Sequence, residues 1–293
     1  MAATLSITAS DVDALVLNPS SITGYSSTKN ISISGDITAS QASALKGVSS
    51  PSITATVEDS SVAILKDITV LSGRTNAFSF KTTGTSASAA DLNTIKSLTT
   101  VKPDFGTILE ITASSAADIK SLYTTGTTTG LGDEKVNIND SNLSASDLKS
   151  INSSTTAEIT ITATKLTGST ADLEAAFTDK GTGAGKIVGL TEIDVEVTDS
   201  VIQAAKLISL DSETAVAGKG IVSIASGSSV EGKVADLKTV YDATVAATPT
   251  IAGLSNKNII LTDTSLTPKS KFTVAEVNQV SGYTSGVLTA TVK

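Results

Sequence analysis

Few side chains in this sequence are of a type that performs catalysis or binds a transition metal. The 293 residues include no histidine and no cysteine, and Arg74 is the single arginine. Catalytic triads, cysteine–histidine dyads and the usual zinc, haem and iron–sulfur sites therefore lack essential groups. We accordingly expect a protein that is not an enzyme and has no catalytic residue.

Acidic side chains are the remaining candidates, because carboxylate and amide oxygens are the ligands that Ca²⁺ prefers. Two clusters qualify, one within residues 133–140 and one that alternates along residues 192–196. Their members are Asp133, Glu134, Asn137, Asn139, Asp140, Glu192, Asp194 and Glu196. The first cluster lacks the loop pattern of an EF-hand. The second cluster places like charges on one strand face, so these charges are either bridged by a cation or solvated. Calcium is thus a candidate ligand, and we expect no other cofactor.

Residues 181–186, Gly-Thr-Gly-Ala-Gly-Lys, invite comparison with a phosphate-binding loop. Such a loop needs four residues between its glycines and a serine or threonine after its lysine. Only three residues separate Gly181 from Gly185, and Ile187 follows Lys186. We therefore interpret this stretch as a flexible insertion between repeats. Paired carboxylates for glycoside hydrolysis are a further alternative, which the absence of tryptophan disfavours because sugars stack on aromatic rings.

The charge balance restricts the kinds of partner. Lys and Arg total 21 against 29 Asp and Glu, a net charge of −8. Without a basic patch we expect no binding to nucleic acid, and no apolar run approaches the ~18 residues of a membrane-spanning helix. The first residues lack the charged and apolar regions of a cleavable signal peptide. This indicates a protein that stays in the cytoplasm, is assembled there into a particle, or leaves by another route.

An internal repeat organises the whole chain. An aspartate followed by two apolar residues three positions apart recurs at residues 91–95, 118–122, 147–151, 172–176 and 236–240. Weaker copies extend the series of apolar anchors, which are Val12, Ala42, Val62, Leu92, Ile119, Leu148, Leu173, Val201, Leu237 and Val277. The first and last anchors are 265 positions apart, so the average step is about 29 residues. Periods of this size are typical of solenoid proteins.

Each anchor is expected to lie in a short helix of roughly eight to ten residues. A serine stands three or four residues before several of the aspartates, as in the pairs Ser88–Asp91, Ser114 or Ser115–Asp118, Ser144–Asp147 and Ser169–Asp172. In this pattern the hydroxyl caps an early backbone N–H, and the acid lies at the positive end of the helix.

Alternating runs stand upstream of the helices and predict strands with one buried face. They cover residues 5–8, 31–34, 53–57, 78–80, 136–139, 159–162, 193–197 and 222–224. The run Ile259–Leu261 is continuous, and we expect it to be buried on both faces.

Strands that alternate with helices predict an α/β fold with parallel strands and right-handed crossovers. Because the strands are apolar on one side, we expect a two-layer βα-repeat solenoid of about ten units. It would have one parallel sheet, helices on one face and a Ser/Thr-rich polar face on the other. Residues 1–251 would form the solenoid, and residues 252–293 an atypical C-terminal capping repeat of the same domain.

Three segments carry a resemblance to known proteins: Ala-Asp-Leu-Asn-Thr-Ile (90–95), Ser-Ala-Ser-Asp-Leu-Lys-Ser-Ile (144–151) and Thr-Gly-Ser-Thr-Ala-Asp-Leu (167–173). They resemble the Ser/Thr-rich repeats of giant cell-surface proteins of marine cyanobacteria, including the swimming-motility type, and of structural proteins of phages that infect them. The resemblance spans nearly the whole chain. It implies a structural or adhesive role and transfers no catalytic residue.

We therefore expect a structural protein of a phage virion, such as a tail fibre, appendage or capsid-decorating subunit, that acts as a rigid interaction scaffold. The alternative is a secreted bacterial surface adhesin or motility protein, or a fragment of one, located at the cell surface without a cleavable signal. The start at Met1 and an atypical last repeat favour the virion, because a giant surface protein would be far longer. Expected partners are other virion or surface proteins, further copies of the chain and a host surface.

Overall fold

The computed structural model describes residues 2–68, 77–214, 219–262 and 272–290. The chain divides into two compact units, unit 1 (Met1–Ile138 and Ser154–Ala157) and unit 2 (Asn139–Ser153 and Glu158–Lys293). Both alternate strands with short helices, and every strand pairing in the described residues that joins two named strands within a unit is parallel. The predicted α/β class is therefore confirmed. A capping repeat from residue 252 stays a prediction.

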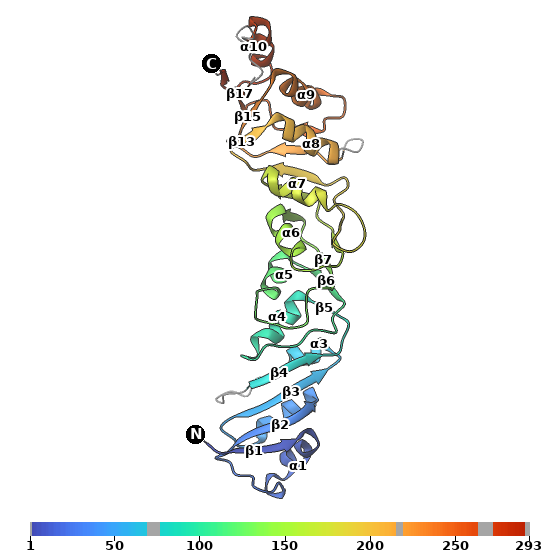
Figure 1. Cartoon of the computed structure of the whole chain (residues 1–293), viewed down its shortest axis with the longest axis vertical. Coiled ribbons are helices and arrows are strands. Elements are labelled where there is room, and N and C mark those ends of the chain that lie inside the picture. Colours follow the sequence, from blue (N-terminus) through green and yellow to red (C-terminus); the bar gives the residue numbers. More distant parts are fainter. Residues whose placement is uncertain (1, 69–76, 215–218, 263–271, 291–293) are drawn as a thin grey trace. The chain divides into compact units, whose positions relative to one another are not determined.

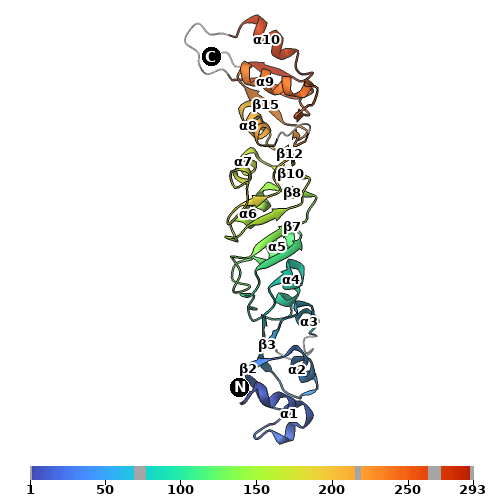
Figure 2. The same ribbon diagram turned by 90° about the vertical axis from the view of Figure 1, so that its right-hand side faces the viewer.

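Unit 1 is built of seven strands and five helices in its described part (Figure 1). The strands are β1 (Thr4–Thr8), β2 (Asn30–Ile37), β3 (Ile53–Asp59), β4 (Ala77–Thr82), β5 (Ser86–Ser88), β6 (Glu110–Ser114) and β7 (Lys135–Ile138). The helices are α1 (Val12–Leu17), α2 (Ala39–Ala44), α3 (Val62–Lys66), α4 (Ala89–Ser97) and α5 (Ala116–Leu122). Strands β1 to β4 form one sheet in sequence order, and β5 to β7 pair in a second. Figure 2 shows α1, α2 and α3 on one side of the first sheet.

Unit 2 has the same alternation with more strands. Its described strands are β8 (Asn142–Ser144), β9 (Ile159–Ile161), β10 (Lys165–Gly168), β11 (Ile187–Val188), β12 (Asp194–Val197), β13 (Val201–Gln203), β14 (Val222–Ile224), β15 (Ser229–Gly232), β16 (Ile251–Ala252), β17 (Asn258–Leu261) and β18 (Leu288–Ala290). Its described helices are α6 (Ala145–Asn152), α7 (Thr170–Thr178), α8 (Ala204–Thr214), α9 (Val234–Val245) and α10 (Val274–Ser281). One sheet has the order β8-β10-β12-β14-β16 and another the order β13-β15-β17-β18.

Strand register measures the repeat length directly. Paired residues in neighbouring strands are 26, 24, 27 and 29 positions apart in four examples, which are Thr4 with Asn30, Ser86 with Glu110, Val195 with Val222 and Ile259 with Leu288. Helices of consecutive repeats also contact one another in both units, as α4 does α5 and α6 does α7. These repeats therefore pack on the next through both the strand and the helix.

Nine of the ten predicted anchors lie in helices, and Val201 does not. Val201 begins β13 and pairs with Ser229 of β15, while α8 starts at Ala204. The apolar spacing from Val201 to Ala204 crosses the junction between strand and helix, so it imitates a helical stripe. The buried residues of α8 are instead Ala204, Leu207, Leu210 and Thr214.

The core is a thin apolar layer made by one strand face and one helix stripe. In β3 buried and half-buried residues alternate, and in α6 the side chains of Ala145, Leu148 and Ile151 have no exposed surface. The continuous run in β17 follows the same rule. Ile259 and Leu261 are buried but Ile260 is half-buried, so the prediction of burial on both faces is wrong.

In the described residues the strands form four separate parallel sheets rather than one continuous sheet. Within unit 2 the sheets are separate because one repeat has a second strand before its helix. Strands β8 and β10 lead directly into helices α6 and α7, and β10 pairs with β12 of the following repeat. Strand β12 does not lead into a helix; in its repeat the strand that leads into α8 is β13, which begins the next sheet. Strands of three residues are too short for alternation to reveal them.

Candidate functional site

Hydroxyl groups fix the helix starts, as predicted. The Oγ atoms of Ser88, Ser115, Ser144 and Ser169 accept hydrogen bonds from the backbone N–H three residues on, at 3.1, 3.1, 3.5 and 3.2 Å. Ser114, the other candidate at α5, has a different role. Its Oγ accepts from the backbone N–H of Ala89, 2.9 Å away at the start of α4 in the preceding repeat.

A second set of hydroxyls joins neighbouring repeats, and we call it the hydroxyl ladder. Each member donates to a backbone carbonyl 23 to 29 residues earlier. Six of the pairs are Ser34 to Ile7 (3.2 Å), Thr54 to Ile31 (3.4 Å), Thr107 to Thr82 (2.6 Å), Ser223 to Val195 (2.9 Å), Ser228 to Asp199 (2.6 Å) and Thr284 to Lys257 (2.6 Å). All six bonds run from a repeat to the one before it. This role of hydroxyls in joining repeats was not predicted from the sequence, although the large number of Ser and Thr residues, 87, was a signal for it.

Helices of successive repeats are joined by polar side chains. Lys66 and Asp91 form an ion pair at 2.6 Å, and Lys149 and Asp172 form one at 3.1 Å. Such exposed pairs contribute about 0–1 kcal/mol each, so they align the repeats more than they stabilise them.

Close approach of backbones sets the spacing between repeats at two equivalent positions in unit 2. A Cβ added to Gly168, at the end of β10, would lie 2.8 Å from the Cβ of Ala145, the first residue of α6. A Cβ added to Gly232, at the end of β15, would lie 2.9 Å from the Cβ of Ala204, the first residue of α8. Glycine and alanine therefore face each other where a strand passes the preceding helix.

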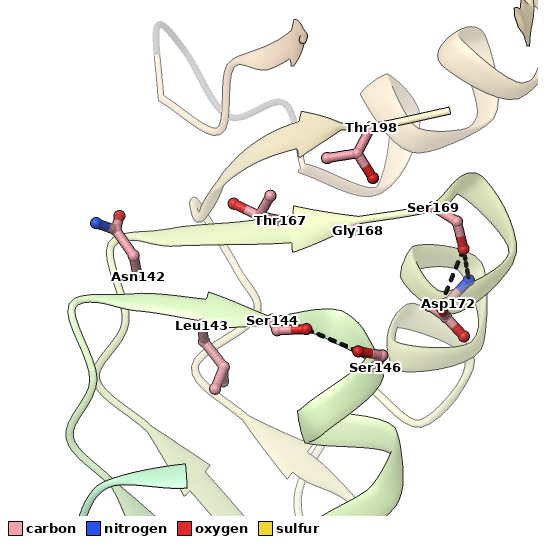
Figure 3. Close-up of a pocket in the computed structure, with 9 residues that line it drawn as sticks. All are labelled: Asn142, Leu143, Ser144, Ser146, Thr167, Gly168, Ser169, Asp172 and Thr198. Atoms are coloured by element: carbon pink, nitrogen blue, oxygen red, sulfur yellow. Dashed lines mark hydrogen bonds between the residues drawn. The ribbon is translucent and has the colours of Figure 1, made fainter. Parts of the chain in front are cut away.

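A shallow groove of about 450 Å³ opens on unit 2 where β8 and β10 meet α6 and α7 (Figure 3). Most of the residues that line it have polar side chains, and they are Asn142, Leu143, Ser144, Ser146, Thr167, Gly168, Ser169, Asp172 and Thr198. Serine and threonine hydroxyls lie in this lining, so their hydrogen-bond partners bear on what the groove can do.

The partners of Ser169 leave its hydroxyl without activation as a nucleophile. Ser169 donates to Asp172 Oδ2 at 3.0 Å and accepts from the backbone N–H of Asp172, so its hydroxyl serves the helix cap. Hydrogen bonds from Lys149 and Ser169 lower the pKa of Asp172, which disfavours it as a general base. The groove offers hydrogen-bonding groups and, in Asp172, a carboxylate that is paired with Lys149.

The first predicted calcium cluster is divided between the two units at Ile138. In unit 1 Asp133 is exposed, and Asn137 donates to Glu110 Oε1 at 2.6 Å. In unit 2 Asn139 is exposed and Asp140 is half-buried.

Glu134, in the same stretch of unit 1, is committed to internal partners. Its side chain is fully buried, and Oε2 accepts from the backbone N–H groups of Gly132 and Asp133 at 2.7 and 3.1 Å. Oε1 accepts the hydroxyl of Tyr123, which follows α5. Burial and this bond raise the pKa of Tyr123, so the phenol stays neutral. The sequence contained no sign of this pair, because both residues lie outside the repeated motif.

The acidic side chains of the second predicted calcium cluster bind to groups of neighbouring repeats. Glu192 is in a turn before β12, with φ of 63°, and pairs with Lys219 at 2.7 Å, so it does not share the strand face predicted for it. Asp194 accepts the backbone N–H of Ile221 at 2.9 Å, and Glu196 pairs with Lys165.

Across the parts of the chain that the structure describes, no three acidic side chains form a group able to hold a metal ion. Calcium binding stays a prediction.

The glycine-rich stretch 181–186 follows α7 and lies outside the helices and strands, as predicted. Its backbone binds a carboxylate of this chain: the N–H of Gly183 donates to Glu158 Oε2 at 2.6 Å. Glu158 lies in the preceding repeat, so this insertion also serves contact between repeats.

None of the helices in the described residues has both the length and the apolarity needed to cross a bilayer. Comparison with models of known protein families finds no match to this chain, and comparison with curated proteins finds none either.

Proposed function

We propose that this chain is a non-enzymatic structural protein, a rigid interaction scaffold that forms part of a phage virion as a tail fibre, appendage or capsid-decorating subunit. One observation carries the proposal: in the described part of the chain, many Ser, Thr, Asp and Lys side chains serve helix caps or contacts between repeats. The hydroxyl ladder and the ion pairs between helices join neighbouring repeats, and the caps begin the helices within them.

The same contacts support a two-layer solenoid as the arrangement of the whole chain. In such a protein, stability is a sum of terms within repeats and between nearest neighbours. Parallel strand pairing at offsets of 20 to 29 residues and helix contacts between consecutive repeats are the terms required. A scaffold of this kind presents its polar strand faces and loops to other virion proteins, to further copies of the chain and to the host surface.

Mass spectrometry of gradient-purified virions tests the proposed location. The expected result is the tryptic fragment of residues 121–135 in the virion at a constant ratio to the major capsid protein. The matched control is the secreted fraction of uninfected host cells. Finding the fragment there and not in the virion would refute the proposal in favour of a surface adhesin.

A further inference from the structure

The groove at β8 and β10 of unit 2 contains hydrogen-bonding side chains that the fold leaves unused. In the part of the chain that the structure describes, the side chains of Asn142, Thr167 and Thr198 make no hydrogen bond to another residue (Figure 3). Asn142 and Thr198 are exposed, and Thr167 is half-buried. The hydroxyls of the caps and of the ladder, in contrast, serve contacts within the chain. These three side chains therefore remain available to a ligand.

Unit 2 contains a second place with the same backbone arrangement. Strand β13 pairs with β15 and leads into α8, as β8 pairs with β10 and leads into α6. Gly232 approaches the first residue of α8 as Gly168 approaches the first residue of α6. In both places the backbone N–H of a threonine donates to the carbonyl of that glycine, from Thr198 at 2.9 Å and from Thr262 at 3.0 Å.

The side chains at equivalent register positions differ between the two places. Asn142, the first residue of β8, corresponds to Val201, the first residue of β13. Thr167 of β10 corresponds to Glu231 of β15. The groove thus has short neutral polar side chains where a similar backbone elsewhere carries an apolar and a charged one. Its lining is therefore a property of these residues and not a consequence of the repeat geometry.

The charges of the groove favour a neutral ligand. Asp172 is the one charged side chain among the described residues that line it, and Lys149 pairs with this carboxylate at 3.1 Å. The described lining includes no lysine or arginine, which are the side chains that bind phosphate and carboxylate groups most strongly. An anionic ligand therefore lacks a counter-charge, and a cation meets a carboxylate that is already paired.

The hydrogen-bonding capacity of the free side chains matches that of a sugar. A threonine hydroxyl both donates and accepts, and an asparagine amide offers two donors and an acceptor oxygen. The hydroxyls of a sugar have the same dual capacity. The groove volume of about 450 Å³ also lies within the range of small-molecule sites, ~300–1,000 Å³.

We propose that this groove binds a neutral hexopyranose unit of a surface glycan, with Asn142, Thr167 and Thr198 as its hydrogen-bonding groups. Each of these groups exchanges water for a sugar hydroxyl, so each bond contributes little net affinity. The described lining has no aromatic ring on which a sugar could stack. The dissociation constant for a single sugar unit is thus of the order of 1 mM.

The inference rests on the proposed function and deepens it, because it names the chemical class that the scaffold recognises on a host surface. A particle that carries many copies of the chain presents the groove many times. Multivalent attachment raises a weak affinity for one sugar unit to a stable adhesion without any new contact.

Saturation-transfer difference NMR with the full chain tests the site. The probes are the methyl glycosides of glucose, galactose and mannose, each titrated to about 10 mM, which is above the expected dissociation constant. We expect transfer of saturation from the protein to at least one of the three. Glucose 1-phosphate is the charged comparison and should bind no better than the neutral glycosides.

Two variants locate the binding in the groove. Thr167→Val combined with Thr198→Val removes two hydroxyls with little change of shape and should weaken binding at least tenfold, since two net hydrogen bonds are lost. Asn142→Val should weaken it about fivefold. The second place accommodates a valine at the corresponding position, Val201, so this variant is expected to fold. The matched control is Thr191→Val, because Thr191 is exposed on unit 2 and lies outside the groove.

Circular dichroism and urea unfolding of each variant separate a lost contact from a lost fold. Transfer to none of the three glycosides would overturn the inference, and so would equal binding by the wild type and the double threonine variant. Tighter binding of glucose 1-phosphate would overturn it as well, since the site would then select an anion. The result is distinguishable from that of the virion test. A chain found in virions that binds no glycoside refutes only the groove, and binding by a chain that is absent from virions refutes only the location.

Discussion

Substitution of Gly168 by alanine should separate two repeats. The new Cβ would lie 2.8 Å from the Cβ of Ala145, whereas carbon atoms in ordinary contact are about 3.5–4.0 Å apart. Gly168 does not have a positive φ, so alanine brings no backbone strain and the contact is the whole effect. Strand β10 and helix α6 must then move apart by roughly 1 Å, and overpacking of this kind costs about 1–3 kcal/mol.

A double-mutant cycle isolates this contact. Ala145→Gly alone should destabilise the chain by about 1 kcal/mol or more, since it removes a buried methyl group and places glycine in a helix. Combined with Gly168→Ala it should restore stability, because the two methyl groups no longer collide. We expect a favourable coupling free energy of about 1–2 kcal/mol.

Urea unfolding followed by circular dichroism measures all four corners of the cycle, because the chain has no tryptophan for fluorescence. The control is Gly47→Ala, where a new Cβ meets nothing within 4 Å, and where the midpoint should stay unchanged or rise slightly. Additive free energies for the two substitutions, or equal losses at Gly47 and Gly168, would refute the argument that this contact sets the repeat spacing.

Three other substitutions probe separate parts of the chain. Leu148→Ala truncates a side chain with no exposed surface and should lower the free energy of unfolding by about 2–5 kcal/mol. The control is Leu17→Ala, where the side chain is 85% exposed and the loss should be less than about 0.5 kcal/mol. Hydrogen exchange should quicken in α7 as well as α6, and a loss of protection confined to α6 would contradict coupling between repeats. Tyr123→Phe takes one donor from the buried carboxylate of Glu134 and should cost about 1–3 kcal/mol; an unchanged urea midpoint would show that the bond is dispensable. Burial raises the pKa of Asp211, so ionisation of this carboxyl opposes folding, and Asp211→Asn should stabilise the chain at about pH 7. That advantage should fade as the pH falls through the raised folded-state pKa and vanish below the unfolded-state value, so a difference in melting temperature that is constant down to about pH 3 would contradict it.

Local rules that act within one repeat were readable from the sequence. The caps at Ser88, Ser144 and Ser169 follow from a hydroxyl three residues before an acid, because both partners lie in one turn of chain. Helix anchors such as Leu148 follow from apolar spacing for the same reason. These features need no knowledge of the neighbouring repeat.

Features that depend on two repeats were not readable. The pattern at Val201 reads as a helix because strand and helix meet there, and only pairing with β15 identifies the strand. Glu192 and Glu196 look like one acidic face, but Lys219 and Lys165 approach them from other repeats. These lysines are 27 and 31 positions away from the glutamates, and a single sequence does not show that residues so far apart pair. The cluster could therefore be interpreted only from its own acidic residues.

The hydroxyl ladder accounts for a composition that caps alone do not. Backbone N–H groups of one strand already donate to the carbonyl oxygens of the neighbouring strand. Each of these oxygens retains a second lone pair, which the hydroxyl of a short side chain can reach. Serine and threonine donate from within one residue of the strand and lose little side-chain entropy, whereas lysine or glutamine would lose more. Because the donor is on the later repeat in each of these bonds, the bond distinguishes the two faces of the repeats that it joins. Part of the high share of Ser and Thr, near 30%, thus serves a directional contact, as the bonds from Ser34 to Ile7 in unit 1 and from Ser223 to Val195 in unit 2 illustrate.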